Sequence, residues 1–335
     1  MTFNITLLAF DQCYTSGVTT MLDVFHVANR LWQRRQPGAG PIFDWRVVSP
    51  DGEPVTTTSR LLLPVDGSIN SVGSTDMLII PGSDFQNTKS YLALNTKLSQ
   101  QCGRQIRKLR AENTIITACC GGPFLLASCG AIQDEPVTIA WWLADLFERT
   151  FPDISLQVDQ LLIDQNNLIT GGAAAYLDMG LYIVEKQADR FLMLECARLL
   201  LADSNRSSQM PYIYLQQQIQ HSDDLVLQAQ QFFRSNIGRE FSLDEVAHGL
   251  NVSQRTLIRR FKQALKQRPI EYLQDLRIET AKRLLETSGM PLDEIIGHVG
   301  YRDISSFRRL FKQRTDLTPR QYRQRFGQST PMKAI

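Results

Sequence analysis

The last hundred residues contain two copies of a helix-turn-helix pattern, and this repeat constrains the fold more than any other feature of the chain. Three apolar positions recur after 49 residues and two more after 50, giving the pairs Leu243 and Leu292, Val246 and Ile295, Leu250 and Val299, Leu257 and Phe307, and Phe261 and Phe311. The second turn is therefore one residue longer than the first. Each copy predicts a short helix, a tight turn and a longer helix.

The second helix of each copy combines an apolar stripe with a basic side. In the first copy Ser253 is the expected N-cap, and Leu257, Phe261 and Leu265 form an i, i+4, i+8 stripe. In the second copy Asp303 is the expected N-cap, and the stripe consists of Phe307, Leu310 and Phe311. The basic residues off the stripes are Arg255, Arg259, Arg260 and Lys262 in the first helix and Arg308, Arg309, Lys312 and Arg314 in the second.

A helix with a buried stripe and exposed arginines can enter a DNA major groove, where guanidinium groups bind guanine edges and phosphates. We therefore predict that double-stranded DNA is contacted by Ser253, Gln254, Arg255, Ile258, Arg259, Lys262, Asp303, Ser305, Ser306, Arg308, Arg309 and Lys312.

The positive charge of the chain is concentrated in the repeat. Residues 223–326 contain 19 Lys and Arg against 13 Asp and Glu, a net charge of +6, whereas the rest contains 17 against 21, a net charge of −4. Ordinary solvated charges on a helical domain would explain a single copy equally well. Two matching copies that carry the positive charge favour a segment that binds a polyanion.

The stretch from 241 to 326 resembles the DNA-binding domain of the AraC/XylS family. The matching residues lie in a central helix, in the second motif and in a closing turn: Tyr272, Leu273, Arg277, Ile278, Ala281, Leu284, Leu285, Gly300, Tyr301, Ser306, Phe307, Phe311, Lys312, Thr318, Pro319, Tyr322 and Arg323. The resemblance implies seven helices that form two subdomains on one rigid central helix. It also implies that both recognition helices meet one face of DNA, in major grooves roughly 34 Å apart.

Length and composition predict two domains, because 335 residues with 43% hydrophobic content can form two cores. Small polar residues replace hydrophobic periodicity over 203–224, which we predict to be a linker. It would join a ligand-sensing and dimerisation domain at 1–202 to a DNA-binding domain at 225–326, followed by a tail at 327–335. The chain lacks an apolar run of about 18 residues and a signal-peptide pattern, so we expect a cytoplasmic protein without a membrane partner.

The six cysteines lie in apolar or irregular contexts, without CxxC pairs or nearby histidines at metal-ligand spacing. We expect reduced thiols rather than disulfides or zinc ligands, and we predict no metal and no cofactor.

Short apolar strands alternate with helical patterns in the first two hundred residues. We expect strands at 4–10, 44–49, 76–80, 114–118 and 167–170, and amphipathic helices at 19–32 and 94–109. Continuous apolar strands separated by helices predict an α/β domain with a flavodoxin-like parallel sheet sandwiched by helices. A helix over 189–202 is more apolar than one packed face requires, so it either packs on this domain or forms a dimer seam.

The junction at 115–127 is the most informative stretch of this half. A strand runs into a helix with Cys120 at the turn and two glycines after it. This is the pattern of a nucleophile elbow, in which strain and a helix N-terminus would lower the pKa of the thiol. With Leu78 to Gly82 and Gly130 to Trp141, the junction resembles the class I glutamine amidotransferase-like superfamily, in the branch of intracellular proteases and Parkinsonism-associated deglycases. The resemblance covers residues 3–188.

Two departures from that family pattern bear on catalysis. Ala140 stands where the branch that carries an AraC-type domain has a histidine, and Gly17 stands where the deglycases have an acidic residue. Nucleophilic catalysis by Cys120 needs a base or an orienting acid on the thiol. We therefore predict no catalytic residue. A thiol hydrolase or deglycase with a DNA-binding appendage is the alternative.

Rigid α/β scaffolds bind ligands in the crevice at the carboxyl ends of their strands. The residues expected there, which we predict to bind the ligand, are Phe10, Asp11, Gly82, Ser83, Asp84, Cys120, Gly121, Trp141 and Tyr176. Trp141 and Trp142 either pack in the core or wall a site for a cationic or amine-bearing metabolite, helped by cation–π attraction and a neighbouring carboxylate. The family resemblance implies a similar class, an amino acid or a quaternary amine.

Together these features predict a sequence-specific transcription regulator, an activator, whose degenerate amidotransferase-like domain senses a small-molecule effector. The expected partners are operator DNA, RNA polymerase and a second copy of the chain in a homodimer. A ligand-independent architectural DNA protein is a third possibility, which the glycine-rich crevice disfavours.

Overall fold

The computed structural model describes residues 2–203, 206–213 and 221–327, and the chain divides into two compact units, Met1–Gln209 and Met210–Ile335. The range 203–224, predicted as a linker, contains this division. Ser207 still bonds to the first unit, because its carbonyl accepts the N–H of Leu161. A short 3-10 helix, η3 (Met210–Tyr212), belongs to the second unit.

The first unit is built on a six-stranded sheet of order β2-β1-β5-β6-β8-β7. Its strands are β1 (Phe3–Leu8), β2 (Phe43–Val48), β5 (Met77–Ile80), β6 (Ile115–Cys119), β7 (Leu162–Gln165) and β8 (Leu168–Gly171). All but β7 are parallel, and they are the strands predicted from apolar runs, with ends shifted by one or two residues. The antiparallel edge strand β7 escaped prediction because half of it is polar. Two short strands, β3 (Val55–Thr56) and β4 (Leu62–Leu63), form a separate hairpin.

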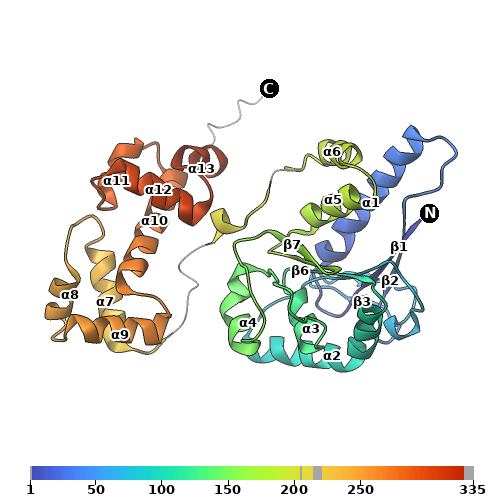
Figure 1. Cartoon of the computed structure of the whole chain (residues 1–335), viewed down its shortest axis with the longest axis horizontal. Helices are drawn as coiled ribbons and strands as arrows, with labels where there is room; N and C mark the ends of the chain where they lie inside the picture. The colour runs from blue at the N-terminus through green and yellow to red at the C-terminus, as the bar shows by residue number, and fades with distance from the viewer. Residues whose placement is uncertain (1, 204–205, 214–220, 328–335) are drawn as a thin grey trace. The chain divides into compact units, whose positions relative to one another are not determined.

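Helices cover both faces of the sheet, as the buried apolar strands require. Figure 1 shows α1 (Thr15–Arg35), α5 (Tyr176–Gln187) and α6 (Arg190–Leu199) on one face, and α2 (Thr88–Ala111), α3 (Gly122–Ser128) and α4 (Ala144–Thr150) on the other. Two 3-10 turns, η1 (Ile69–Ser71) and η2 (Trp141–Leu143), complete the unit. This arrangement confirms the predicted flavodoxin-like sandwich.

Helix α6 packs on α1 and α5 through four buried residues, Leu192, Met193, Cys196 and Ala197. On its other side Phe191 and Leu199 are 61% and 63% exposed. The helix therefore packs on its own domain and still presents an apolar face. Within the described parts of the chain, every helix is too short or too polar to cross a membrane.

The described part of the second unit contains seven α-helices: α7 (Asp224–Ser235), α8 (Leu243–Gly249), α9 (Gln254–Leu265), α10 (Pro269–Thr287), α11 (Leu292–His298), α12 (Ile304–Thr315) and α13 (Pro319–Phe326). They form two hydrophobic clusters. One joins α7, α8 and α9 to Tyr272 and Leu273 of α10, and the other joins α11, α12 and α13 to Ile278, Ala281 and Leu285 of the same helix. Because α10 belongs to both cores, it holds the two helix-turn-helix subdomains together.

Candidate nucleic-acid interface and effector site

The second helix of each repeat begins at the predicted N-cap. The Ser253 hydroxyl accepts the N–H of Thr256 at 3.2 Å, and the Asp303 carboxylate accepts the N–H groups of Ser305 and Ser306 at 3.1 and 2.9 Å. Both helices end in a left-handed residue, with φ of 59° at Lys266 and 56° at Asp316. The two recognition helices are therefore fixed at both ends by local backbone chemistry.

The apolar stripes of α9 and α12 face the protein interior, and most of the basic and polar residues predicted to contact DNA face outward. Leu257, Phe261, Phe307 and Phe311 are fully buried. Among the residues predicted to contact DNA, Ile258 and Ser306 are half-buried and the others are exposed. Basic and polar side chains at the start of each helix are thus available to a groove, which is where a recognition helix meets bases.

Two arginines of the predicted basic side, Arg260 and Arg314, form ion pairs within the protein. Both Asp223 oxygens accept hydrogen bonds from Arg260, the second at 2.7 Å, and this contact lowers the pKa of the Asp223 carboxyl. Arg314 pairs with Asp275 of α10 at 2.7 Å. The first pair ties α9 to the residue that precedes α7 in its own subdomain, and the second ties α12 to the shared helix α10. Arg260 and Arg314 lie off the apolar stripes, as the sequence places them, but each is held in an ion pair within the protein.

The junction between β6 and α3 has the predicted elbow geometry. Cys120 has a φ of 61°, which is strained for a residue with a side chain. Its N–H donates to the carbonyls of Gly171 and Gly172 at 2.9 and 3.2 Å, and its carbonyl accepts the N–H of Ala140 at 3.0 Å. Only 3% of the residue is exposed.

Burial outweighs the lowering of the Cys120 thiol pKa that an elbow turn favours. Burial raises its pKa to about 11, against the lowering effects of nearby backbone groups and of a hydrogen bond with Tyr176. Desolvation disfavours the charged thiolate more than the turn favours it. The thiol is therefore protonated at neutral pH.

Gly17 and Ala140, which stand at the acid and base positions of the family pattern, are both tightly enclosed. A Cβ added at Gly17 would lie 2.7 Å from the Cβ of Pro81 and 3.0 Å from the ring of Tyr176. The Tyr176 hydroxyl in turn accepts the N–H of Gly82 at 3.2 Å. Ala140 is fully buried beside Cys120. A neutral phenol hydrogen-bonds the thiol, and neither Gly17 nor Ala140 supplies the acid or the base that nucleophilic catalysis needs.

The other predicted ligand-binding residues divide into a buried group and an accessible group, here called the rim. Phe10, Gly82, Ser83, Gly121 and Tyr176 are buried together with Cys120. On the rim, Asp11 is exposed, and Asp84 and Trp141 are half-buried. The Asp11 carboxylate already accepts the N–H of Thr56 at 2.8 Å.

Two tyrosines at this edge escaped prediction. Tyr14 is half-buried and shares a hydrogen bond with Asp84, and burial raises its pKa to about 12. The Tyr91 hydroxyl donates to the carbonyl of Gly121 at 3.2 Å. Tyr14 follows β1 in the loop that supplies Asp11. The expectation that ligands bind at the carboxyl ends of the strands could therefore have identified it. Tyr91 lies in α2 and carries no such signal.

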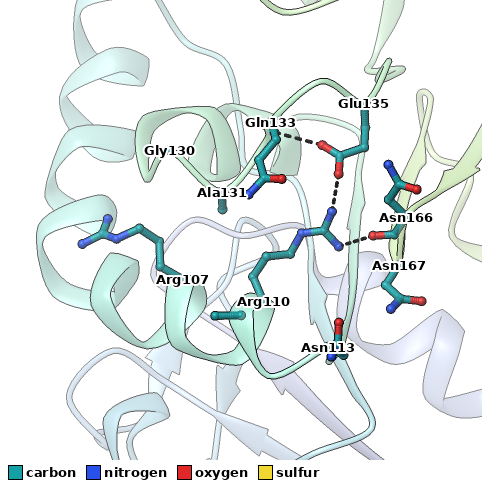
Figure 2. A pocket seen from close by; sticks show the side chains of 10 residues that line it. Arg107, Arg110, Asn113, Gly130, Ala131, Gln133, Glu135, Asn166 and Asn167 are labelled. Carbon is teal, nitrogen blue, oxygen red and sulfur yellow. Dashed lines mark hydrogen bonds and ion pairs between the residues drawn. The ribbon is translucent and has the colours of Figure 1, made fainter.

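A hollow of about 460 Å³ lies at the opposite edge of the sheet, next to Asn113 before β6 and Asn166 before β8. Figure 2 shows Arg110 pointing toward Glu135 and Asn166; its guanidinium donates to the Glu135 carboxylate at 2.6 Å and to the Asn166 carbonyl at 2.5 Å. Arg107 donates to the Cys129 carbonyl at 2.7 Å. The Arg107 and Arg110 charges are satisfied within the protein.

Comparisons with known proteins match each half of the chain. The model of the DJ-1/PfpI family matches residues 5–186, and a model described as a helix-turn-helix domain matches residues 246–325. The HTH-type transcriptional regulator GbdR of Pseudomonas aeruginosa is 23% identical over 322 residues, which cover 96% of this chain and 84% of that protein. The regulator CdhR of the same organism is 22% identical over 309 residues, covering 92% and 87%. The HTH-type transcriptional activator RhaR of Yersinia pestis is 28% identical over 148 residues, covering 44% and 49%.

Among solved structures, a putative transcriptional regulator protein from Vibrio parahaemolyticus superposes with a TM-score of 0.51 at 20% identity, covering 60% of this chain and all of that one. A ThiJ/PfpI family protein from Pseudomonas syringae reaches a TM-score of 0.50 at 17% identity, covering 62% and 77%. At such identities the likeness shows a shared fold.

Proposed function

The chain belongs to the DJ-1/PfpI family and carries a C-terminal AraC-type helix-turn-helix domain, and we propose that it couples binding of a small molecule at the Cys120 edge to transcription from its operator. It is a DNA-binding transcription regulator. The observation that carries this function is the pair of capped helices α9 and α12, each with a buried stripe and an exposed basic face, on the shared helix α10.

In the DNA-binding half, the overall positive charge would supply affinity for DNA, and individual side chains of α9 and α12 would supply sequence specificity. The net charge of +6 over residues 223–326 supplies salt-sensitive attraction to phosphates. Arg255 and Arg259 in α9, and Ser305, Arg308 and Arg309 in α12, are exposed and are proposed to contact base edges or adjacent phosphates. Two recognition helices in one chain would give each subunit two major-groove contacts.

The effector site is proposed at the rim formed by Tyr14, Asp84 and Trp141, with the buried residues around Cys120 as its floor. A carboxylate beside aromatic rings suits a cationic group through charge and cation–π attraction. Trp142, 40% exposed, packs edge-on against Trp141 with ring centroids 5.5 Å apart. We infer an amino acid or amine as the class of ligand.

A catalytic role is not part of the proposal. The Cys120 thiol is protonated at neutral pH, Ala140 offers no base, and the Tyr176 ring fills the space beside Gly17. A thiol hydrolase remains the alternative. It would require turnover of an amide or glyoxal substrate that Cys120→Ala abolishes.

The regulator is proposed to act as an activator, as the relative RhaR is named, and hence to contact RNA polymerase. A homodimer is proposed through the apolar face of α6, where Phe191 and Leu199 are more than half exposed. Sedimentation of a Leu199→Lys variant tests this interface. The expected result is a monomer with unchanged unfolding behaviour; a dimer of wild-type stability would contradict it.

The function itself is tested by selecting duplexes from a random pool with the full-length protein. Enrichment of one sequence that spans two major grooves is expected, with weaker binding when Arg255 and Arg308 are both replaced by Ala. The effector is tested by thermal unfolding with a panel of amino acids and quaternary amines, because a ligand that binds the folded state stabilises it. Asp84→Asn should remove the stabilisation, and Asp153→Asn, an exposed acid on the same unit, should keep it.

A further inference from the structure

Gln209 is the last residue of the first unit, and its side chain is anchored inside that unit. The residue is only 2% exposed. Its amide nitrogen donates to the Ile139 carbonyl at 2.8 Å and to the Thr138 hydroxyl at 3.2 Å, and its amide oxygen accepts the N–H of Ala173 at 3.3 Å. A buried amide with partners on both atoms is held in one position.

The two segments that Gln209 joins are the segments that hold Cys120. Ala140, next to Ile139, donates its N–H to the Cys120 carbonyl at 3.0 Å. Gly172, next to Ala173, accepts the Cys120 N–H at 3.2 Å. A Cβ added at Gly172 would lie 2.8 Å from the Gln209 amide, so the side chain lies directly against this backbone. Gln209 therefore bridges both flanks of the proposed effector site.

The residues that follow are anchored in the second unit. The Ile213 carbonyl accepts a hydrogen bond from Lys282 at 2.5 Å, and the Pro211 carbonyl accepts one from the Tyr322 hydroxyl at 3.5 Å. The ring of Tyr212 packs edge-on against Phe326 with centroids 5.2 Å apart. Lys282 is only 2% exposed, although a lysine is rarely buried. Residues 211–213 are thus part of the packing of α10 and α13.

We propose that residues 209–213 transmit the state of the effector site to the second helix-turn-helix subdomain, with Gln209 as the positioning residue at the sensor end. This inference rests on the proposed function. An extended chain spans at most about 3.3–3.6 Å per residue, so four peptide units between two anchors leave little slack. Movement of residues 139 and 173 around a ligand therefore displaces the chain that packs on α10 and α13.

Coupling between two sites is reciprocal, so it can be measured without knowing the effector. The probe is the operator duplex obtained by selection, and the readout is amide hydrogen exchange in peptides that contain Cys120 and Ala140. In the full-length protein, saturating operator should change this exchange by about fivefold or more, the lower range of allosteric coupling. A Gly-Ser insertion between Gln209 and Met210 should remove that change while the operator still binds.

The matched control is the same insertion between Gly40 and Pro41, two exposed residues of the first unit, which should keep the change. At the level of single residues, Gln209→Ala should reduce the change. Gln160→Ala should not, because the Gln160 side chain is exposed and donates to the neighbouring Asp159 carboxylate at 3.0 Å. Two results would overturn this inference and leave the proposed function standing. One is an operator-induced change in exchange as large in the Gln209–Met210 insertion variant as in the wild type, and the other is no change in the wild type with operator bound. Failure to select any operator would overturn the proposed function as well.

Discussion

The ring of Tyr176 lies against the backbone of Gly17, so closely that a Cβ added at Gly17 would be 3.0 Å from it. The same tyrosine hydrogen-bonds the Cys120 thiol and the N–H of Gly82. Burial raises the pKa of Tyr176, so its hydroxyl stays neutral. The first helix therefore places a glycine, and not a carboxylate, against the tyrosine that hydrogen-bonds the thiol.

This packing predicts that Gly17→Ala destabilises the first unit. Helix propensity alone would favour Ala over Gly by about 0.8–1 kcal/mol. A contact of 2.7 Å with the Cβ of Pro81 must instead be relieved by moving a buried neighbour, which costs about 1–3 kcal/mol. All four tryptophans lie in the first unit, so urea unfolding followed by tryptophan fluorescence measures the change.

Gly297→Ala is the matched control for that substitution. Gly297 lies inside α11, and a Cβ there meets nothing within 4 Å. The Gly297→Ala variant should be more stable than the wild type, as measured by unfolding followed with far-ultraviolet circular dichroism. Stabilisation by Gly17→Ala of similar size would show that Tyr176 does not crowd this position.

Cys120 should behave as an unreactive thiol. Alkylation proceeds through the thiolate, and burial raises the folded pKa to about 11, so the rate should be low at neutral pH and rise through a midpoint near that value. The neutral thiol is favoured by the fold, so any stability linked to it is present at lower pH and is lost as pH rises through the folded pKa. Alkylation of native protein as a function of pH, located by peptide fragmentation, checks the midpoint. A midpoint below the ordinary thiol value would indicate an activated nucleophile.

Adjacent arginines of α9 should differ in their effect on DNA binding. Arg255→Ala and Arg259→Ala remove exposed groups, so each should weaken operator binding by about 1–3 kcal/mol where it contacts a base and relax specificity there. Arg260→Ala removes the partner of Asp223 and should lower the stability of the second unit without changing base preference. Competition binding with operator variants separates these outcomes. Equal relaxation of specificity by all three would refute the assignment of Arg260 as a structural residue.

Residues upstream of α7 should stabilise the isolated DNA-binding domain. A fragment of residues 210–335 keeps the packing of Tyr212 on Phe326 and the N-cap that Asp223 supplies to Val226 at 3.2 Å. A fragment of residues 225–335 loses both, and loss of the cap alone costs about 1 kcal/mol. We expect both to bind the selected operator in a salt-dependent manner and the shorter one to unfold at a lower temperature. Equal melting temperatures would show that residues 210–224 contribute no stability.

Local patterns predicted the features that depend on local chemistry. Buried parallel strands are continuously apolar, so β1, β5 and β6 could be placed within two residues, and the caps Ser253 and Asp303 follow from side-chain oxygens at the start of a stripe. Tertiary contacts decided the rest. Arg260 looks free on a helical wheel until Asp223 is brought to it, and the elbow pattern carries no information on how deeply Cys120 is buried.

Gln209 also shows that tertiary contacts cannot be predicted from local sequence, because a residue in a linker-like stretch is buried in the structure. It follows a run of small polar residues without a hydrophobic period, which is typical of a linker, yet it is one of the most buried polar residues of the first unit. Its partners are backbone groups of residues 139 and 173, which leave no trace in composition.

The sharing of α10 by both hydrophobic clusters bears on how the target promoters of this regulator can evolve. A single helix fixes the separation of α9 and α12, so the two groove contacts within one binding site have a set phase along the duplex. One inserted base pair between them would rotate one contact by roughly a tenth of a turn relative to the other. New sites for this protein should therefore arise by base substitution at constant length, and insertions or deletions between the contacts should be selected against.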